Sequence, residues 1–234
     1  FPYLYAKGSP HSVDELRVAA ASAAILGPFG GPATSILKAA ALRAPPALRP
    51  AYDTVLVRGA LVRGDFADAR ARAQRLVSAQ PDSIVAHRLL RTVCELARDP
   101  ACVVADAQVV AARDPADVEA VEIVADDRAR QGDFTGAAAL LRRVTASSDP
   151  PPRAANLLAW LALFTRDDMS QAIVTADQAS SRASPGNASS SLHTLAALYA
   201  ETGRDADALA TLGKSLDAGA ATSLREFDWY VVGR

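Results

Sequence analysis

Gly64-Asp65-Phe66 and Gly132-Asp133-Phe134 are one tripeptide found at two places in the chain. Half of the interval between the two copies, about 34 residues, also separates Pro81 from Pro115. A period of this length is the size of one antiparallel pair of helices, which cannot bury its apolar face alone and therefore stacks on copies of itself. The spacing predicts a repeat protein built from helix pairs.

The first clear unit, residues 50–83, carries the residues that characterise the repeat. These are Leu56 in its first helix, Gly64 and Phe66 at the turn, Ala69 in its second helix and Pro81 at its end. The layout resembles the tetratricopeptide repeat. The resemblance implies an all-α, right-handed α-solenoid of antiparallel helix pairs with about 12–13 helices, in which the first helices of the pairs line a concave wall.

The register divides the chain into two regions. Residues 50–234 hold about five repeats and the first helix of a sixth, and residues 1–49 hold an extended N-terminal arm, at 1–10, and a diverged helix pair. The second repeat is degenerate, with Arg98 where the turn glycine is expected, and the closing proline of the third, Pro150, falls one residue late. Because the sixth repeat stops after one helix, we expect the native chain to continue, or another domain or chain to cap this end.

The composition limits the classes of function that the chain can have. Hydrophobic residues make up 50% of the chain and charged residues 22%, which indicates a folded protein. With 25 basic and 26 acidic residues, the net charge of -1 predicts no nucleic-acid partner. No apolar run approaches the roughly 20 residues of a membrane span, so no membrane insertion is expected. The preference for Ala, Arg and Asp over Lys, Asn and Ile is typical of GC-rich bacteria.

Residues on the inner face of the first helices are the candidates for partner binding. In this register they are Arg58, Arg88, Thr92, Glu95, Glu119, Glu122, Asp126, Leu157, Leu161, Phe164 and His193. Helical spacing places Glu119, Glu122 and Asp126 on one face, where three carboxylates could hold a basic or N-terminal segment of a partner. The alternative is a solvated helix face on which Arg130 pairs with Asp126.

An apolar stripe on the fourth repeat has two interpretations as well. It consists of Leu157, Leu161 and Phe164. The stripe could receive an amphipathic helix of a partner, or it could pack against a neighbouring element such as the N-terminal arm.

The two cysteines, Cys94 and Cys102, stand on either side of the turn at residues 97–100. In a helix hairpin they lie at similar height and could approach the roughly 5.5 Å Cα separation of a disulfide. The alternatives are a disulfide that staples the degenerate repeat or two buried thiols. A disulfide would indicate a periplasmic or secreted protein, and free thiols a cytoplasmic one.

No arrangement of residues predicts catalysis. His11, His87 and His193 have no metal-ligand spacing, and no phosphate loop or catalytic triad is visible, so we expect no metal, no cofactor and no enzymatic activity. The sequence predicts a scaffold that binds a peptide or helix of a partner protein in its concave groove. The alternative is a helical accessory or regulatory region of a larger enzyme or regulator whose active domain lies outside this segment.

Overall fold

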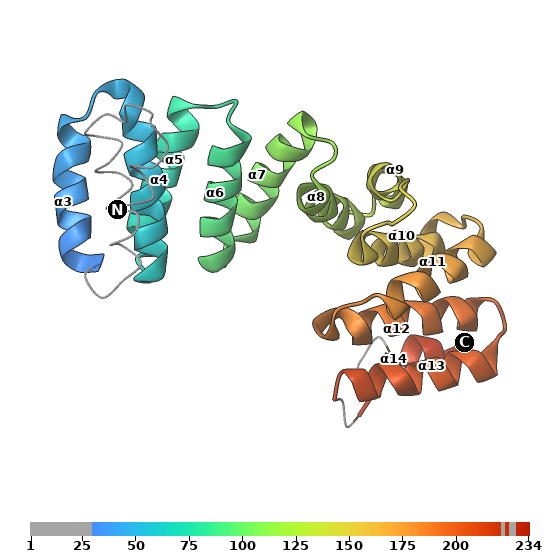
Figure 1. Ribbon diagram of the computed structural model, residues 1–234. Coiled ribbons are helices and arrows are strands. Elements are labelled where there is room, and N and C mark those ends of the chain that lie inside the picture. The colour runs from blue at the N-terminus through green and yellow to red at the C-terminus, as the bar shows by residue number, and fades with distance from the viewer. Residues whose placement is uncertain (1–29, 221–222, 225–227) are drawn as a thin grey trace, which may run out of the picture. The chain divides into compact units, whose positions relative to one another are not determined.

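The computed structural model describes residues 30–220, 223–224 and 228–234, and every regular element in this part of the chain is a helix (Figure 1). The all-α prediction is confirmed; the expected arm at residues 1–10 lies outside the described residues. The elements are α3 (Gly30–Arg43), the 3₁₀-helix η1 (Pro46–Leu48), α4 (Arg49–Val62), α5 (Phe66–Ala79), α6 (Ile84–Leu96), α7 (Pro100–Arg113), α8 (Val118–Arg130), α9 (Phe134–Val144), α10 (Pro152–Thr165), α11 (Met169–Ser181), α12 (Pro185–Glu201), α13 (Asp205–Ala218) and α14 (Asp228–Gly233).

The helices follow one another in pairs joined by short turns. The pairs are α4 with α5, α6 with α7, α8 with α9, α10 with α11, and α12 with α13. The chain forms two compact units, residues 1–106 and residues 107–234, and the boundary falls within α7. In the second unit α10 packs against both α8 and α12. The first helices of three successive pairs therefore lie side by side in this unit.

A residue with a left-handed backbone closes the turn inside each pair. These residues are Gly64 (φ 73°), Arg98 (φ 56°), Gly132 (φ 85°), Arg166 (φ 54°) and Gly203 (φ 71°). The first four follow one another at intervals of one period, and the last falls slightly later than the period predicts. Glycine enters this conformation without a steric penalty, whereas a residue with a Cβ atom does not. The pairs that have Arg98 or Arg166 at this position thus keep the turn geometry although they lack the glycine.

The aspartate of the repeated Gly-Asp-Phe tripeptide begins the second helix. The side chain of Asp65 accepts a hydrogen bond from the backbone N–H of Asp68 at 3.1 Å, and Asp133 does the same for Gly136 at 2.9 Å. Both bonds satisfy N–H groups that have no partner within the helix. The tripeptide therefore specifies a turn and a helix start.

Small apolar side chains fill the cores. Leu56 and Ala69, which help to set the repeat register, are fully buried, as is Ala73. Alanine is frequent among the other core residues as well, and its small side chain lets packed helices approach closely. The positions that identify the repeat are therefore packing positions.

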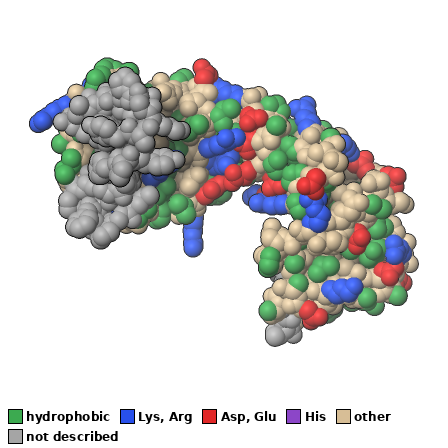
Figure 2. Space-filling view, viewed as in Figure 1, with side chains coloured by type: hydrophobic (Ala, Val, Ile, Leu, Met, Phe, Trp, Pro, Cys, Tyr) green, Lys and Arg blue, Asp and Glu red, His purple; other side chains and the backbone are tan. Residues whose placement is uncertain are grey.

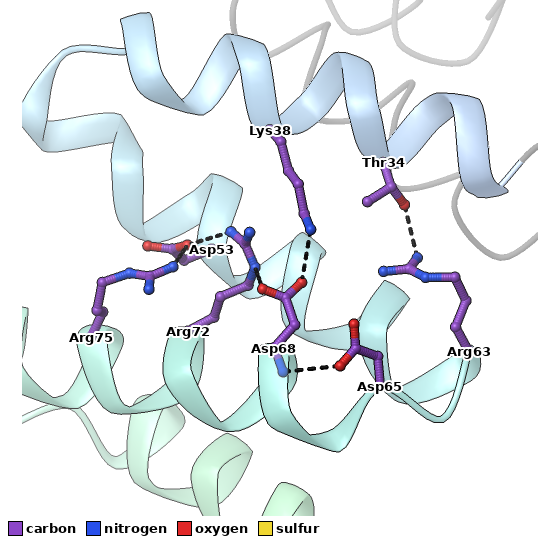
Figure 3. Close-up of polar contacts among 8 residues, drawn as sticks. All are labelled: Thr34, Lys38, Asp53, Arg63, Asp65, Asp68, Arg72 and Arg75. Atoms are coloured by element: carbon purple, nitrogen blue, oxygen red, sulfur yellow. Dashed lines mark hydrogen bonds and ion pairs between the residues drawn. The ribbon is translucent and has the colours of Figure 1, made fainter.

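A polar network joins three helices of the first unit (Figure 3). Asp68 of α5 accepts from Lys38 Nζ of α3 at 3.2 Å and from Arg72 Nε at 2.9 Å, and Nη1 of Arg72 also lies 3.1 Å from Oδ1 of Asp53 in α4. The side chain of Arg72 is only 11% exposed, so these pairs are more shielded from water than ordinary surface ion pairs. The network ties α3, α4 and α5 together.

Two surface properties follow the composition. On the face shown in Figure 2, basic and acidic side chains are interspersed over the described residues and do not gather by sign. Among the same residues, no helix combines the length and hydrophobicity needed to cross a membrane.

Candidate functional site

The predicted binding residues of the first unit lie at its surface. Arg58 on α4 and Arg88, Thr92 and Glu95 on α6 are all exposed. The Thr92 hydroxyl donates to the backbone carbonyl of Arg88 at 3.0 Å, and Oε1 of Glu95 lies 3.5 Å from Nε of the buried Arg91. Their part in partner binding stays a prediction.

Only part of the predicted carboxylate cluster on α8 is open to solvent. Glu119 is exposed, and Asp126 forms an ion pair with Arg130, four residues later, as in the alternative interpretation. Glu122 is buried, with an exposed fraction of 6%. The three carboxylates share one helix face, but they do not form one exposed acidic surface.

Glu122 has a structural partner instead. Its carboxylate lies 3.5 Å from Nε of Arg153 and near the backbone N–H of Ala154, and both residues belong to the first turn of α10. The residue before this helix is Pro151, which supplies no side-chain cap. Burial raises the pKa of the Glu122 carboxyl, against the lowering effect of Arg153 and of this N–H. Glu122 therefore lies against the first turn of α10 from the preceding first helix.

Leu161 does not belong to an exposed stripe, and this prediction is corrected. It is fully buried in a core cluster with Ala125 and Leu141. The reason is a shift of one residue: α10 begins at Pro152, one period after Val118, so Asn156 and not Leu157 corresponds to Glu122. Leu157 is nevertheless partly exposed.

Phe164 and His193 make internal contacts. Phe164 is 46% exposed and stacks on Phe134, with ring centroids 4.4 Å apart. His193 is only 6% exposed, and its Nδ1 lies 3.1 Å from Oδ1 of the fully buried Asp228 on α14. The prediction that His193 faces a partner is therefore corrected, because the ring lies between α12 and α14.

The structure has a hollow on the face formed by α8, α10 and α12. It is a cavity of about 170 Å³. Its lining residues are Asp126, Arg153, Asn156, Leu157, Asn187, Ser190 and Ser191. Two of the predicted residues, Asp126 and Leu157, thus meet at one site. Sequence reasoning missed the amide and hydroxyl side chains, because its register on α10 was one residue late and α12 starts early.

The early start of α12 explains the hollow. Val118 and Pro152, where α8 and α10 begin, precede the turn residues of their pairs by the same interval. Pro185, where α12 begins, precedes its turn residue Gly203 by an interval that is four residues longer. Four residues are about one helical turn, and the extra turn contains Asn187. The N-terminus of α12 is thereby displaced along the helix axis by one turn.

Asn156 is left without a partner as a result. At the corresponding position of α8, Glu122 lies against the first turn of the next first helix, but α12 begins one turn early relative to its turn residue. The Oδ1 atom of Asn156 is buried and accepts no hydrogen bond. A buried acceptor without a donor is unfavourable, so this oxygen is suited to a donor supplied by a ligand.

A larger cavity lies at the other side of α10. It has a volume of about 300 Å³ and is lined by α9, α10 and α11. Small apolar side chains such as Ala159, Ala162 and Ala172 form much of it, and Arg142 at its edge pairs with Asp167. Asp168, which also lines this cavity, accepts from the backbone N–H groups of Ser170 and Gln171, so each charged group here has a partner; the hollow at α12 differs because it contains the unpartnered Oδ1 of Asn156.

Cys94 and Cys102 form a disulfide between α6 and α7, with their Cα atoms 5.8 Å apart. Asp106, one turn after Cys102, lies beside it, and these three residues place metal-type ligand atoms within 4.8 Å of one another. Metals bind thiolates, and the S–S bond occupies both sulfurs. The i,i+4 spacing of Cys102 and Asp106 was the sequence signal for this neighbourhood.

The comparisons with known proteins identify the fold. No protein-family model and no curated protein sequence matches the chain. Among solved structures, a tetratricopeptide repeat protein from Parabacteroides merdae aligns with a TM-score of 0.62 and 16% identity, covering 94% of this chain and 84% of that one. MamA aligns with a TM-score of 0.56 and 16% identity over 70% of this chain and 95% of its own. The apo form of the quorum sensor NprR from B. thuringiensis aligns with a TM-score of 0.59 and 8% identity, covering 94% of this chain and 69% of that one. With the regular spacing of the turns, these likenesses show that the chain is an all-α repeat solenoid with the tetratricopeptide repeat fold.

Proposed function

We propose that this protein is an interaction scaffold, without enzymatic activity, that binds an extended segment of a partner protein in the groove formed by α8, α10 and α12. The observation that carries the proposal is the buried, unpartnered Oδ1 of Asn156 in the wall of the hollow. Backbone N–H groups of an extended peptide are donors of the kind that this oxygen lacks.

The chemistry of the hollow favours an uncharged peptide stretch. Its two charged residues already have partners, since Asp126 pairs with Arg130 and Arg153 lies beside Glu122. The other groups of the lining are the amides of Asn156 and Asn187, two serine hydroxyls and the apolar Leu157; the hydroxyl of Ser190 donates to the backbone carbonyl of Asn187 at 3.0 Å. No feature of the described residues favours the alternative of an accessory region of a larger enzyme or regulator.

Selection from a random peptide library displayed on phage tests this function. Asn156→Leu removes the amide while keeping the side-chain size, and Gln171→Leu makes the same type of change at an exposed position of α11. We expect selected peptides to bind the Asn156→Leu variant roughly tenfold or more weakly, since a hydrogen bond in a buried site contributes about 1–3 kcal/mol. They should bind the Gln171→Leu variant like the wild type. Peptides that bind all three proteins equally would refute the groove.

The disulfide supports a location in an oxidising compartment. Reducing systems keep most cytosolic thiols free, whereas periplasmic and secreted proteins retain their disulfides. We therefore place the protein in the periplasm or outside the cell. Free thiols at Cys94 and Cys102 in protein alkylated directly in cells of the source organism would contradict this location.

A further inference from the structure

The surroundings of the Cys94–Cys102 disulfide differ between its two sulfur atoms. Cys94, near the end of α6, is fully buried, whereas Cys102, in the first turn of α7, is partly exposed. A thiolate that cleaves a disulfide must reach one of the two sulfurs, so access helps to decide which is attacked. Access from solvent therefore favours attack on the sulfur of Cys102.

Cys94 lies beside a cation. Nη2 of Arg70, on α5, is 3.8 Å from Sγ of Cys94, and the same guanidinium forms an ion pair with Asp99. Asp99 also accepts the backbone N–H of Cys102 at 3.1 Å, so one carboxylate holds both the arginine and the start of α7. A positive charge stabilises a thiolate, and a thiol of lower pKa leaves faster. This arrangement makes Cys94 the better leaving sulfur.

Cys102 lies beside a buried carboxyl group. Oδ2 of Asp106 is 3.8 Å from Sγ of Cys102, and Oδ1 is 2.7 Å from Nδ1 of His87. Burial raises the pKa of Asp106, against the lowering effect of His87. A carboxyl with a raised pKa holds its proton to higher pH and can give it to a thiolate formed next to it.

We propose that Cys94–Cys102 is a thiol–disulfide exchange site, at which a dithiol attacks Cys102 and releases Cys94 as the thiolate beside Arg70. A new S–S bond forms between the dithiol and Cys102, and the electron pair of the broken bond goes to Cys94. The second thiolate of the reagent then attacks the reagent's own sulfur in this mixed disulfide. The reagent leaves as a disulfide and Cys102 becomes a thiolate that takes up a proton. The protein gains two electrons and the dithiol loses two.

The first experiment uses the full chain, purified without reductant. Its intact mass should rise by two hydrogens after treatment with dithiothreitol. Glutathione is added to a second sample, the reaction is stopped with acid, and peptide mapping locates the mixed disulfide, which we expect on Cys102. Three results would each overturn the proposal: equal masses before and after reduction, glutathione mainly on Cys94, or cleavage only after the chain has been unfolded in urea.

Single-cysteine variants measure the difference between the sulfurs directly. The thiol of Cys102 in Cys94→Ser should react with an aromatic disulfide reagent at least about tenfold faster than the buried Cys94 thiol in Cys102→Ser. Circular dichroism establishes that both variants are folded. Equal rates in folded variants would contradict the assignment of Cys102 as the attacked sulfur. If either variant is unfolded, the peptide mapping of the glutathione adduct in the wild type decides which sulfur is attacked.

The role of Arg70 can be tested against a control substitution of another arginine on the same helix, α5. Arg70→Met should slow reduction of the disulfide by dithiothreitol roughly three- to tenfold, because the leaving thiolate loses its neighbouring cation. Arg75→Met removes the same charge from α5, where the arginine pairs with Asp53. It should leave the rate unchanged. Equal rates for the two variants would show that Arg70 does not activate Cys94.

Discussion

Gly132→Ala and Arg166→Gly should change the free energy of unfolding in opposite directions, although the two residues occupy the same position in equivalent turns one period apart. Gly132 has φ 85°, and a Cβ atom built there meets nothing within 4 Å, so the penalty for alanine is purely conformational. A left-handed backbone costs a residue with a Cβ atom about 1–2 kcal/mol. Alanine recovers about 0.5–1 kcal/mol because its unfolded chain has less freedom. We expect a net loss of about 0.5–1 kcal/mol.

The same reasoning with the opposite sign applies to Arg166. Its φ of 54° carries the left-handed penalty in the wild type, and glycine removes it. The backbone N–H of Arg166 donates to the carbonyl of Ala162 at 3.0 Å, a bond that glycine keeps. Arg166→Gly should therefore raise the free energy of unfolding by about 0.5–1 kcal/mol.

Urea unfolding followed by circular dichroism measures both effects. With a slope of about 2 kcal/mol per molar, the two midpoints should move by roughly 0.3–0.5 M in opposite directions. Gly213→Ala is the control: this glycine is inside α13, has no left-handed φ and has open space at its Cβ position, so alanine should stabilise by up to about 1 kcal/mol. A neutral Gly132→Ala, or a destabilising Arg166→Gly, would refute the shared turn geometry.

Two changes test the buried carboxylate of Glu122 and the partly buried carboxylate of Asp68. Glu122→Ala should lower the free energy of unfolding by about 1–3 kcal/mol because it removes the acceptor that lies beside Arg153 in the first turn of α10, while Glu122→Gln keeps an acceptor and should lose less; equal urea midpoints for the two variants would contradict this role. Asp68→Asn should cost about 1 kcal/mol at neutral pH. Burial alone would raise the pKa of Asp68, but bonds from Arg72 and Lys38 outweigh it and lower that pKa. The stabilisation by Asp68 is complete above the unfolded-state pKa of about 3.9 and is lost as the pH falls through the lower folded-state pKa. The difference in free energy of unfolding between Asp68→Asn and the wild type should therefore shrink below about pH 4. A difference that stays constant with pH would argue against this network.

The repeat architecture could be predicted because its signals are local. The turn glycines, the aspartates that follow two of them and the alanines of the second helices lie within one helix pair, and they recur at a fixed spacing. The turns at Arg98 and Arg166 could be placed only by the period, because arginine gives no sign of a left-handed backbone. On α10 the inner face was placed one residue further along the chain than the period of about 34 residues gives, because Asn156 and not Leu157 lies one period after Glu122.

The burial of single polar residues could not be predicted, since it depends on helices that are distant in sequence. Glu122 is buried because the N-terminus of α10 lies over it, and its neighbour Arg153 belongs to the next helix pair. His193 is buried because Asp228 of α14 lies against it. Period and hydrophobic pattern place both residues on the inner face of a helix, but they do not show that the next element covers them.

In the proposed function, one repeat position serves the fold at Glu122 and recognition at Asn156. They lie one period apart on α8 and α10. The Glu122 carboxylate lies beside Arg153 in the first turn of α10. The interval from Arg166 to Gly203 exceeds the period by three residues, α12 begins one turn early, and the amide oxygen of Asn156 is left buried without a donor. In a fold whose packing positions repeat, a departure from the period leaves polar groups that the fold does not use, so the break between Arg166 and Gly203 is where we place partner recognition.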